Sequence, residues 1–237
     1  MRTIAVVTGA ARGIGRAITE TLLDQGLCVI AADIRPIPYQ RPYLAPFCVD
    51  LTDQHAVRHF FECIARTYGG IDVLVNNAGS CIMEEFLETT STTLHAQMAM
   101  NFDGAFYCCQ SAIPLMQRRV GTKKIINISS NGAYNYEVFD PAPYRASKAA
   151  LDSLTKHLAR RHATERICVN SIAPAMTRTD LFDVVSPDVL AKAIAGMPHG
   201  EPMQPTQIAQ WVAFLASPMG DCCSGNVIIL NQGRDVR

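Results

Sequence analysis

The sequence has no surplus of either charge, since 21 Lys and Arg residues balance 21 Asp and Glu residues. Binding to nucleic acid or to an anionic membrane through bulk charge requires a basic excess, so the composition disfavours both partners. Charged residues make up 18% of the chain and hydrophobic residues 49%, which is too apolar for a disordered polypeptide. We therefore expect one compact domain over residues 1–237, long enough to bury a large core.

Long hydrophobic runs are also missing, because none approaches the ~18 residues of a membrane-spanning helix. The first residues, Met1-Arg2-Thr3, lead directly into an apolar segment without the charged, apolar and small-residue regions of a signal peptide. The nine cysteines contain no C-x-x-C spacing and include two adjacent pairs, which suits neither a disulfide framework nor a zinc site. We expect a cytoplasmic protein with reduced, buried thiols and no bound metal.

Uninterrupted apolar runs alternate with helical periodicity along the chain. The runs are typical of strands covered on both faces, and they comprise Ile4–Val7, Cys28–Ala32, Ile71–Val75, Lys124–Ile128, Ile167–Ile172 and Val227–Leu230. Helices are predicted after the first run and at residues 55–68, 92–119, 146–161 and 207–215. This alternation predicts an α/β fold with a doubly wound parallel sheet and right-handed crossovers.

Two segments interrupt the alternation. Residues 33–47 carry four prolines, so the crossover there is predicted to be an irregular loop rather than a helix. Residues 177–205 also carry four prolines, around a short apolar segment at residues 189–194. This second segment is predicted to be a substrate lid with one short helix.

Gly9, Gly13 and Gly15 form a G-x-x-x-G-x-G pattern where the first strand turns into a helix. Glycines allow a tight turn there and let a pyrophosphate approach the positive end of the helix, although a glycine cluster alone also fits an ordinary turn. Asp33 ends the next strand, near the spacing of a carboxylate that hydrogen-bonds an adenosine ribose. Together these features predict a dinucleotide site.

Asp33 also bears on the choice of nucleotide. A carboxylate at this position repels a 2′-phosphate and favours NAD, whereas Arg12 and Arg35 would favour NADP by pairing with that phosphate. We expect NAD, with NADP as the alternative. Asp50 follows the proline-rich segment and is expected at the carboxyl ends of the strands, where ligands bind in open α/β sheets, but it equally fits a carboxylate at a helix N-terminus.

Tyr144 and Lys148 are four residues apart at the start of a predicted helix, so they share one face. An ammonium beside a tyrosine stabilises the phenolate that a general base requires, although such a pair also occurs on ordinary helix surfaces. Ser130 follows a buried strand, where its hydroxyl would face the crevice and hydrogen-bond a substrate oxygen. Serine is also an ordinary residue at a strand end.

Four motifs occur in order along the chain: Thr8-Gly-Ala-Ala-Arg-Gly13-Ile-Gly15, Asn76-Asn-Ala-Gly79, Ser130 and Tyr144-Arg-Ala-Ser-Lys148. In order and spacing they resemble the short-chain dehydrogenase/reductase family over essentially the whole chain. The resemblance implies a single Rossmann-like domain that binds NAD or NADP, a homotetramer, and hydride transfer between the nicotinamide and a secondary alcohol or ketone.

The resemblance also implies roles for individual residues. Tyr144 would be the general acid/base, Lys148 would lower its pKa and hold the nicotinamide ribose, and Ser130 would orient the substrate oxygen. Asn101 would support a proton relay through water, although it also fits a kink in a long helix. The implied cofactor-binding residues are Gly9, Arg12, Gly13, Ile14, Gly15, Asp33, Asp50, Leu51, Asn77, Ala78, Gly79, Tyr144, Lys148, Pro174, Thr177 and Thr179.

The chain departs from the family pattern at several positions. Ala175 replaces the usual glycine after Pro174, and the interval from Ser130 to Tyr144 is one residue longer than usual, which leaves Ser129 as a rival serine. The expected pocket walls carry few fixed charges, and their aromatic residues are Tyr134, Tyr136, Phe139 and Phe182. A small cyclic diol, a sugar-like alcohol or another hydroxy compound fits such walls. The alternatives are a 3-oxoacyl-carrier-protein ketoreductase and a non-catalytic nucleotide sensor.

Overall fold

The computed structural model describes residues 2–134, 141–180, 182 and 186–234. Seven parallel strands form one sheet in the order β3-β2-β1-β4-β5-β6-β7. The strands are β1 (Ile4–Thr8), β2 (Cys28–Asp33), β3 (Leu44–Cys48), β4 (Val73–Asn76), β5 (Lys123–Ile128), β6 (Ile167–Pro174) and β7 (Val227–Leu230). The order reverses between β1 and β4, and ligands bind at such a switch point in open α/β sheets. The predicted doubly wound, Rossmann-like fold is confirmed.

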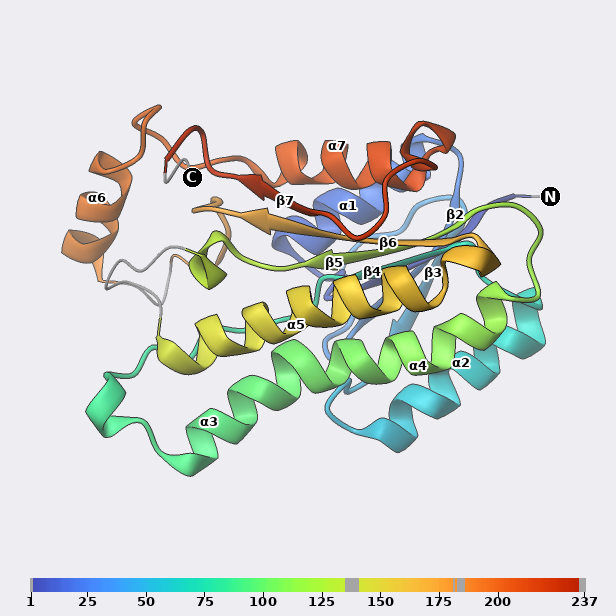
Figure 1. Cartoon of the computed structure of the whole chain (residues 1–237), viewed down its shortest axis with the longest axis horizontal. Helices are drawn as coiled ribbons and strands as arrows, with labels where there is room; N and C mark the ends of the chain where they lie inside the picture. Colours follow the sequence, from blue (N-terminus) through green and yellow to red (C-terminus); the bar gives the residue numbers. More distant parts are fainter. Residues whose placement is uncertain (1, 135–140, 181, 183–185, 235–237) are drawn as a thin grey trace.

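Helices cover both faces of this sheet (Figure 1). They are α1 (Gly13–Asp24), α2 (Gln54–Tyr68), α3 (Ser91–Met98), α4 (Gly104–Met116), α5 (Ala142–Arg161), α6 (Pro187–Ala195) and α7 (Pro205–Ala216). Helices α1 and α7 pack on one face, and α2, α4 and α5 lie on the other (Figure 1). Helix α6 stands off the ends of β5, β6 and β7. None of the described helices is long and apolar enough to cross a membrane.

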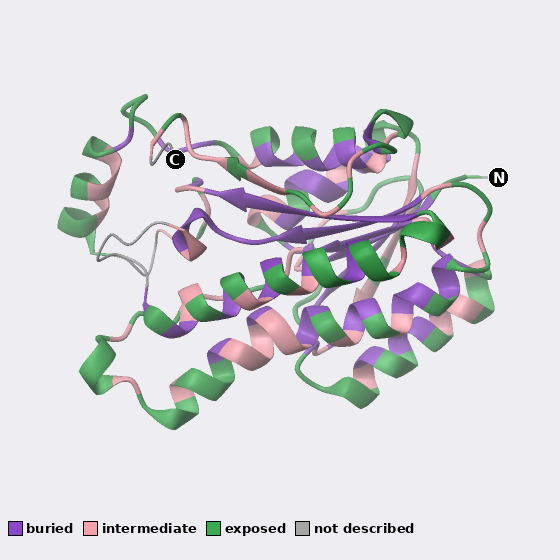
Figure 2. Ribbon diagram, in the orientation of Figure 1, coloured by how far each residue is buried: buried purple, intermediate pink, exposed green. Residues whose placement is uncertain are grey.

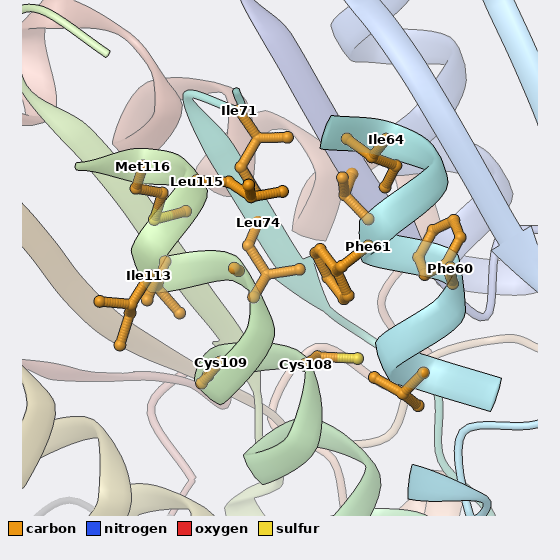
Figure 3. Close-up of a cluster of buried hydrophobic side chains, with 14 of the residues drawn as sticks. Phe60, Phe61, Ile64, Ile71, Leu74, Cys108, Cys109, Ile113, Leu115 and Met116 are labelled. Atoms are coloured by element: carbon orange, nitrogen blue, oxygen red, sulfur yellow. The ribbon is translucent and has the colours of Figure 1, made fainter. Parts of the chain in front are cut away.

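The core consists of two apolar layers, one on each side of the sheet, and Figure 2 shows the strands buried between the helices. Side chains alternate along β1, so Ile4 and Val6 join the layer under α2 and α4, while Ala5 and Val7 join the layer under α1 and α7. Figure 3 shows the first of these layers, with Leu74 of β4 among side chains of α2 and α4. Burial on both faces explains why the strands read as uninterrupted apolar runs.

The proline-rich crossover is shorter than predicted, because β3 occupies its last part. Residues 34–43 contain no helix, but the chain is extended from Leu44, and Pro46 pairs in register with Ala31 of β2. β3 lies at the edge of the sheet, where a proline costs no hydrogen bond to a further strand. The prediction of an irregular loop up to residue 47 is therefore wrong in its last residues.

The long helix predicted at residues 92–119 is not continuous. Helix α3 ends at Met98, a π-helical turn follows at Ala99–Asp103, and α4 runs from Gly104 to Met116. Such π turns are rare and often lie at functional sites. The prediction for the cysteines also needs correction: all nine are free, but only Cys108, Cys109 and Cys168 are buried, while the others are partly or fully exposed.

Candidate active site

A cavity of 480 Å³ opens at the carboxyl end of the strands, at the switch point between β1 and β4. Its walls include most of the residues singled out from the sequence: Gly9, Arg12, Gly13, Ile14, Gly15, Asp33, Asp50, Leu51, Asn77, Ala78, Gly79, Tyr144, Lys148 and Thr179. The cavity thus joins the glycine turn and the end of β2 to the first turns of α5.

The glycine turn between β1 and α1 has no room for a side chain at Gly9 or at Gly15. A Cβ on Gly15 would lie 2.0 Å from the carbonyl oxygen of Gly9, and a Cβ on Gly9 would lie 2.8 Å from the Cα of Ala78. Gly9 also has a φ of +65°, which favours glycine. The amide Nδ2 of Asn77 donates to the carbonyl oxygens of Thr8 and Gly9, so Asn77 holds the turn as well as lining the cavity.

The N-terminus of α1 faces this cavity with its backbone N–H groups uncapped. The N-cap residue, Arg12, makes no side-chain capping hydrogen bond, and the first turn carries no acidic residue. Helix N-termini of this kind bind phosphate groups. The guanidinium of Arg12 forms an ion pair of 2.8 Å with Asp180, which links the turn to the segment after β6.

Asp33, the last residue of β2, is buried at the cavity wall. Its Oδ2 accepts a hydrogen bond of 3.0 Å from the backbone N–H of Ala11, and its Oδ1 accepts one of 3.0 Å from the backbone N–H of Arg35. The Arg35 guanidinium lies 3.5 Å from the same carboxylate. This part of the cavity wall therefore carries both the buried negative charge of Asp33 and the half-exposed positive charge of Arg35.

Asp50 does not cap the following helix. Its Oδ1 accepts hydrogen bonds from the backbone N–H and the hydroxyl of Thr52. The cap of α2 is Asp53, which accepts from the N–H groups of His55 and Ala56. Asp50 instead lines the cavity, as the binding alternative requires.

Tyr144 and Lys148 lie in the first turns of α5, which begins earlier than the predicted Ala146. Pro141 and Pro143 favour a helix start here, because proline fits the first turn. The Lys148 side chain is buried and its Nζ donates to the carbonyl oxygen of Ile128 at 2.9 Å. Burial lowers the pKa of Lys148 to about 8, and the electrostatic interactions with Asp152 and Cys81 act in the opposite direction. Its Nζ lies 6.0 Å from the centroid of the Tyr144 ring.

Asn101 lies in the π-helical turn with its side chain buried. Its amide accepts from the backbone N–H of Ser80 and donates to the Ser80 carbonyl and to the hydroxyl of Ser147. Sequence analysis missed Gln97, which lies one turn earlier. Gln97 is fully buried, donates to the Ser80 carbonyl and accepts from the N–H of Ile82. Both amides therefore fix the segment after β4, and no motif in the sequence marks Gln97.

The two serines after β5 have different surroundings. Ser130 accepts a hydrogen bond of 3.0 Å from the N–H of Gly132 and caps a short 3-10 turn. Ser129 is buried, and its hydroxyl donates to Asp152 at 2.9 Å. Asp152 is a second residue that sequence analysis missed. Both serines are buried, and Ser130, at 9% exposed, is only slightly more accessible than Ser129, at 4%.

Not every predicted residue lines the cavity. Asn101, Ser130, Pro174 and Thr177 are not among the described residues of its wall. The hydroxyl of Thr177 donates to the Ala175 carbonyl at 3.0 Å. The neighbouring Thr179 does reach the wall, where its Cγ2 lies 3.4 Å from the place of a Cβ on Gly13.

The predicted aromatic walls are only partly described. Tyr136 and Phe139 lie outside the described residues. Tyr134 directs its hydroxyl to Asp152 at 2.8 Å, so it belongs to the hydrogen-bond network beneath α5. Phe182 is described, in a short turn after Thr179. Taken together, the fold and the cavity define a doubly wound α/β protein with a cavity at the switch point of its sheet.

Comparisons with known proteins agree with this class. The family described as Enoyl-(Acyl carrier protein) reductase matches residues 9–235. The 2,3-dihydroxy-2,3-dihydro-p-cumate dehydrogenase of Pseudomonas putida is 31% identical over 97% of this chain and 93% of its own. A 3-oxoacyl-acyl-carrier-protein reductase of Thermotoga maritima is also 31% identical, over 97% of this chain and 96% of its own.

A solved structure extends the similarity to the fold. The ligand-free aldohexose dehydrogenase of Thermoplasma acidophilum superposes with a TM-score of 0.90 and 30% identity, and the match covers 100% of this chain and 95% of that one. The chain therefore belongs to the short-chain dehydrogenase/reductase family. It is an oxidoreductase of the type that acts on hydroxyl or keto groups.

Proposed function

We propose that the protein is an NAD-dependent dehydrogenase that interconverts a secondary alcohol and a ketone. The substrate is a small cyclic diol, a sugar-like alcohol or another hydroxy compound. The observation that carries the proposal is the cavity itself, which has the buried carboxylate of Asp33 in its wall together with Tyr144 and Lys148.

The residues present fit a dinucleotide. The uncapped N-terminus of α1 and the glycine turn would hold its pyrophosphate, and Asp33 would accept hydrogen bonds from the adenosine ribose. Lys148 would hold the nicotinamide ribose, and Thr179 the carboxamide. Asp33 is buried whereas Arg12 and Arg35 are half-exposed, and Arg12 is already paired with Asp180. A 2′-phosphate would therefore meet a fixed anion first, which favours NAD over NADP.

In the proposed reaction the cofactor and the side chains of the protein have separate roles. When bound, the nicotinamide accepts hydride from the alcohol carbon or returns it to the ketone. Tyr144 takes the hydroxyl proton during oxidation and gives it back during reduction. The Lys148 ammonium stabilises the Tyr144 phenolate, and Ser130 orients the substrate oxygen. Asn101 hydrogen-bonds the backbone of Ser80 and supports the relay through water that carries the proton away from Tyr144.

The substrate class is supported by the relatives and by the segment after β6. One relative is named for a dihydrodiol and one solved structure for an aldohexose. Residues 177–205 are proposed to act as a lid, because α6 stands beyond the ends of the strands (Figure 1) and none of its residues is buried. A lid of this kind encloses a small substrate and excludes water.

A carrier-protein ketoreductase is the second candidate, because the Thermotoga maritima relative is as similar as the diol dehydrogenase. This candidate predicts NADPH-dependent reduction of a 3-oxoacyl thioester. A non-catalytic nucleotide sensor is the third, and it predicts nucleotide binding without turnover. The proposed dehydrogenase requires all of Asn101, Ser130, Tyr144 and Lys148, and the chain has them.

The test is a binding titration with NAD and NADP separately, followed by absorbance of the reduced nicotinamide against cyclic diols, sugar alcohols and a 3-oxoacyl thioester. We expect tighter binding of NAD and turnover of a diol or sugar-like alcohol. Preference for NADPH with turnover of the thioester would overturn the proposal in favour of the ketoreductase. Binding without any turnover would support the sensor, and binding of neither nucleotide would refute all three.

We also propose a cytoplasmic homotetramer. Nine free thiols fit a reducing compartment. Large apolar side chains are exposed on α4, α7 and β7, namely Phe106, Trp211, Phe214 and Ile229. Such patches are typical of subunit interfaces. Sedimentation at micromolar concentration tests the assembly, and a monomer would contradict it.

A further inference from the structure

Asp152 continues the helical face that carries Tyr144 and Lys148. The three residues recur at intervals of four along α5, so they lie one above another on one side of the helix. Asp152 is 2% exposed and Lys148 is 4% exposed. A buried carboxylate therefore lies one turn from the buried ammonium of the candidate site.

Three hydroxyl groups converge on this carboxylate from separate segments. Ser171 of β6 donates to Oδ1 at 2.5 Å, while Ser129 and Tyr134 donate to Oδ2 at 2.9 and 2.8 Å. An ionised carboxylate only accepts hydrogen bonds, and each oxygen can accept more than one. The arrangement thus suits the charged form of Asp152, which is costly to bury without such donors.

The network also reaches the backbone next to the candidate catalytic residues. The Ser129 hydroxyl lies 3.3 Å from the Lys148 carbonyl oxygen, and Ser129 directly precedes Ser130. The Nζ of Lys148 donates to Ile128, the residue before Ser129. Asp152 therefore ties the end of β5 to the helix that carries the ammonium.

The charged and titratable groups around this pair are few among the described residues. Lys148 is faced by Tyr144 and Asp152 of its own helix and by Cys81 of the segment after β4, and Asp152 is faced by Tyr134 after β5. Burial lowers the pKa of Lys148, and the electrostatic interaction with Asp152 is the largest effect that raises it. On balance the pKa of Asp152 is raised, because burial outweighs the three hydroxyls and Lys148, which lower it.

We propose that Asp152 is a positioning residue that keeps Lys148 protonated in its buried place and anchors the end of β5 beside Ser130. This inference deepens the proposed function and rests on it, since the charge of Lys148 matters for stabilising the Tyr144 phenolate. The residue touches neither substrate nor cofactor in this account. It acts through the ammonium and through the backbone at Ser129.

A titration of Lys148 tests the inference without reference to activity. The chain has five lysines, so labelling with [ε-13C]lysine gives few resonances, and Lys148→Arg assigns the one of interest. In Asp152→Asn, which keeps the side-chain shape and removes the charge, the Lys148 pKa should fall by about one unit or more. Ser171→Ala is the matched control, because it removes one hydrogen bond and keeps the carboxylate. An unchanged Lys148 pKa in folded Asp152→Asn overturns the inference.

The wild type supplies a second test in case Asp152→Asn does not fold. The 13C resonance of the Asp152 carboxyl, assigned by its displacement in Ser171→Ala, should show the ionised form at pH 7. A protonated carboxyl at pH 7 would overturn the inference by itself.

The pH dependence of alcohol oxidation then connects the residue to function. With the Lys148 pKa one unit lower, less of the ammonium remains at alkaline pH, so kcat of Asp152→Asn should be about tenfold below wild type at pH 9 but close to it at pH 6. A uniform loss at all pH values would indicate a structural role and contradict the inference. If the wild type oxidises no alcohol while the Lys148 pKa still falls in Asp152→Asn, the proposed function is wrong. The effect of Asp152 on the protonation of Lys148 is then still supported.

Discussion

Thr8 and Asn77 hold each other through reciprocal hydrogen bonds at the switch point of the sheet. The Oγ1 of Thr8 accepts from the backbone N–H of Asn77 at 3.0 Å, and the Nδ2 of Asn77 donates to the Thr8 carbonyl at 2.9 Å. The same amide donates to the Gly9 carbonyl at 3.1 Å. The cofactor turn after β1 is therefore fixed by the segment after β4.

Asn77→Ala should loosen this turn. It leaves the carbonyls of Thr8 and Gly9 without their donor, which costs about 1–3 kcal/mol for buried polar groups. We expect a lower melting temperature and weaker NAD binding. A double-mutant cycle with Thr8→Val, read by thermal unfolding, should give a non-additive effect, because each side chain bonds the backbone of the other residue and both changes therefore loosen the same turn. Strict additivity would show that the reciprocal contact carries no coupling.

Leu74→Ala tests the core between the sheet and α2 and α4. Leu74 is fully buried among the side chains shown in Figure 3, so the change removes apolar contacts and leaves a cavity. We expect a loss of about 2–5 kcal/mol in the free energy of unfolding, measured by denaturant titration. Leu74→Met should cost less than about 1.5 kcal/mol. Leu87→Ala, at a side chain that is 94% exposed, should change stability by less than about 0.5 kcal/mol.

Asp33→Ser should change the cofactor preference. Removing the carboxylate takes away the ribose acceptor and the repulsion of a 2′-phosphate, and it frees the Arg35 guanidinium that lies 3.5 Å away. We expect weaker NAD binding and stronger NADP binding, measured by titration of each nucleotide. Arg35→Ala in the Asp33→Ser background should abolish the gain for NADP. An unchanged preference in Asp33→Ser would contradict the role given to this carboxylate.

Most of the architecture could be predicted from the sequence, because buried parallel strands and amphipathic helices leave strong local patterns. β3 was obscured by Pro46, which the edge of the sheet tolerates but a central strand would not. The π-helical turn around Asn101 was foreshadowed only by the alternative of a kink in a long helix, since the hydrophobic pattern continues through it without a break. Local patterns do not report how tertiary contacts change the winding of a helix.

The residues of the candidate site also differ in whether the sequence predicts them. Glycines and the Tyr144–Lys148 pair are marked by motifs, so they could be found from the sequence. Asp152 and Gln97 could not, because their partners lie on segments remote in the sequence and an isolated Asp or Gln in a helix is usually solvated. Only the fold brings Ser171 of β6 to the Asp152 carboxylate. Buried polar networks of this kind require a structure to be recognised.

Tyr144 is proposed to perform acid/base chemistry on an alcohol with NAD as the hydride acceptor. The most direct test compares the wild type with Tyr144→Phe in the formation of reduced nicotinamide from NAD and the best diol or sugar-like alcohol of the panel. Loss of the phenol should lower kcat by about 100-fold to 10,000-fold. NAD affinity should stay close to the wild-type value, because the ring that lines the cavity remains. Turnover by Tyr144→Phe near the wild-type rate would contradict the account.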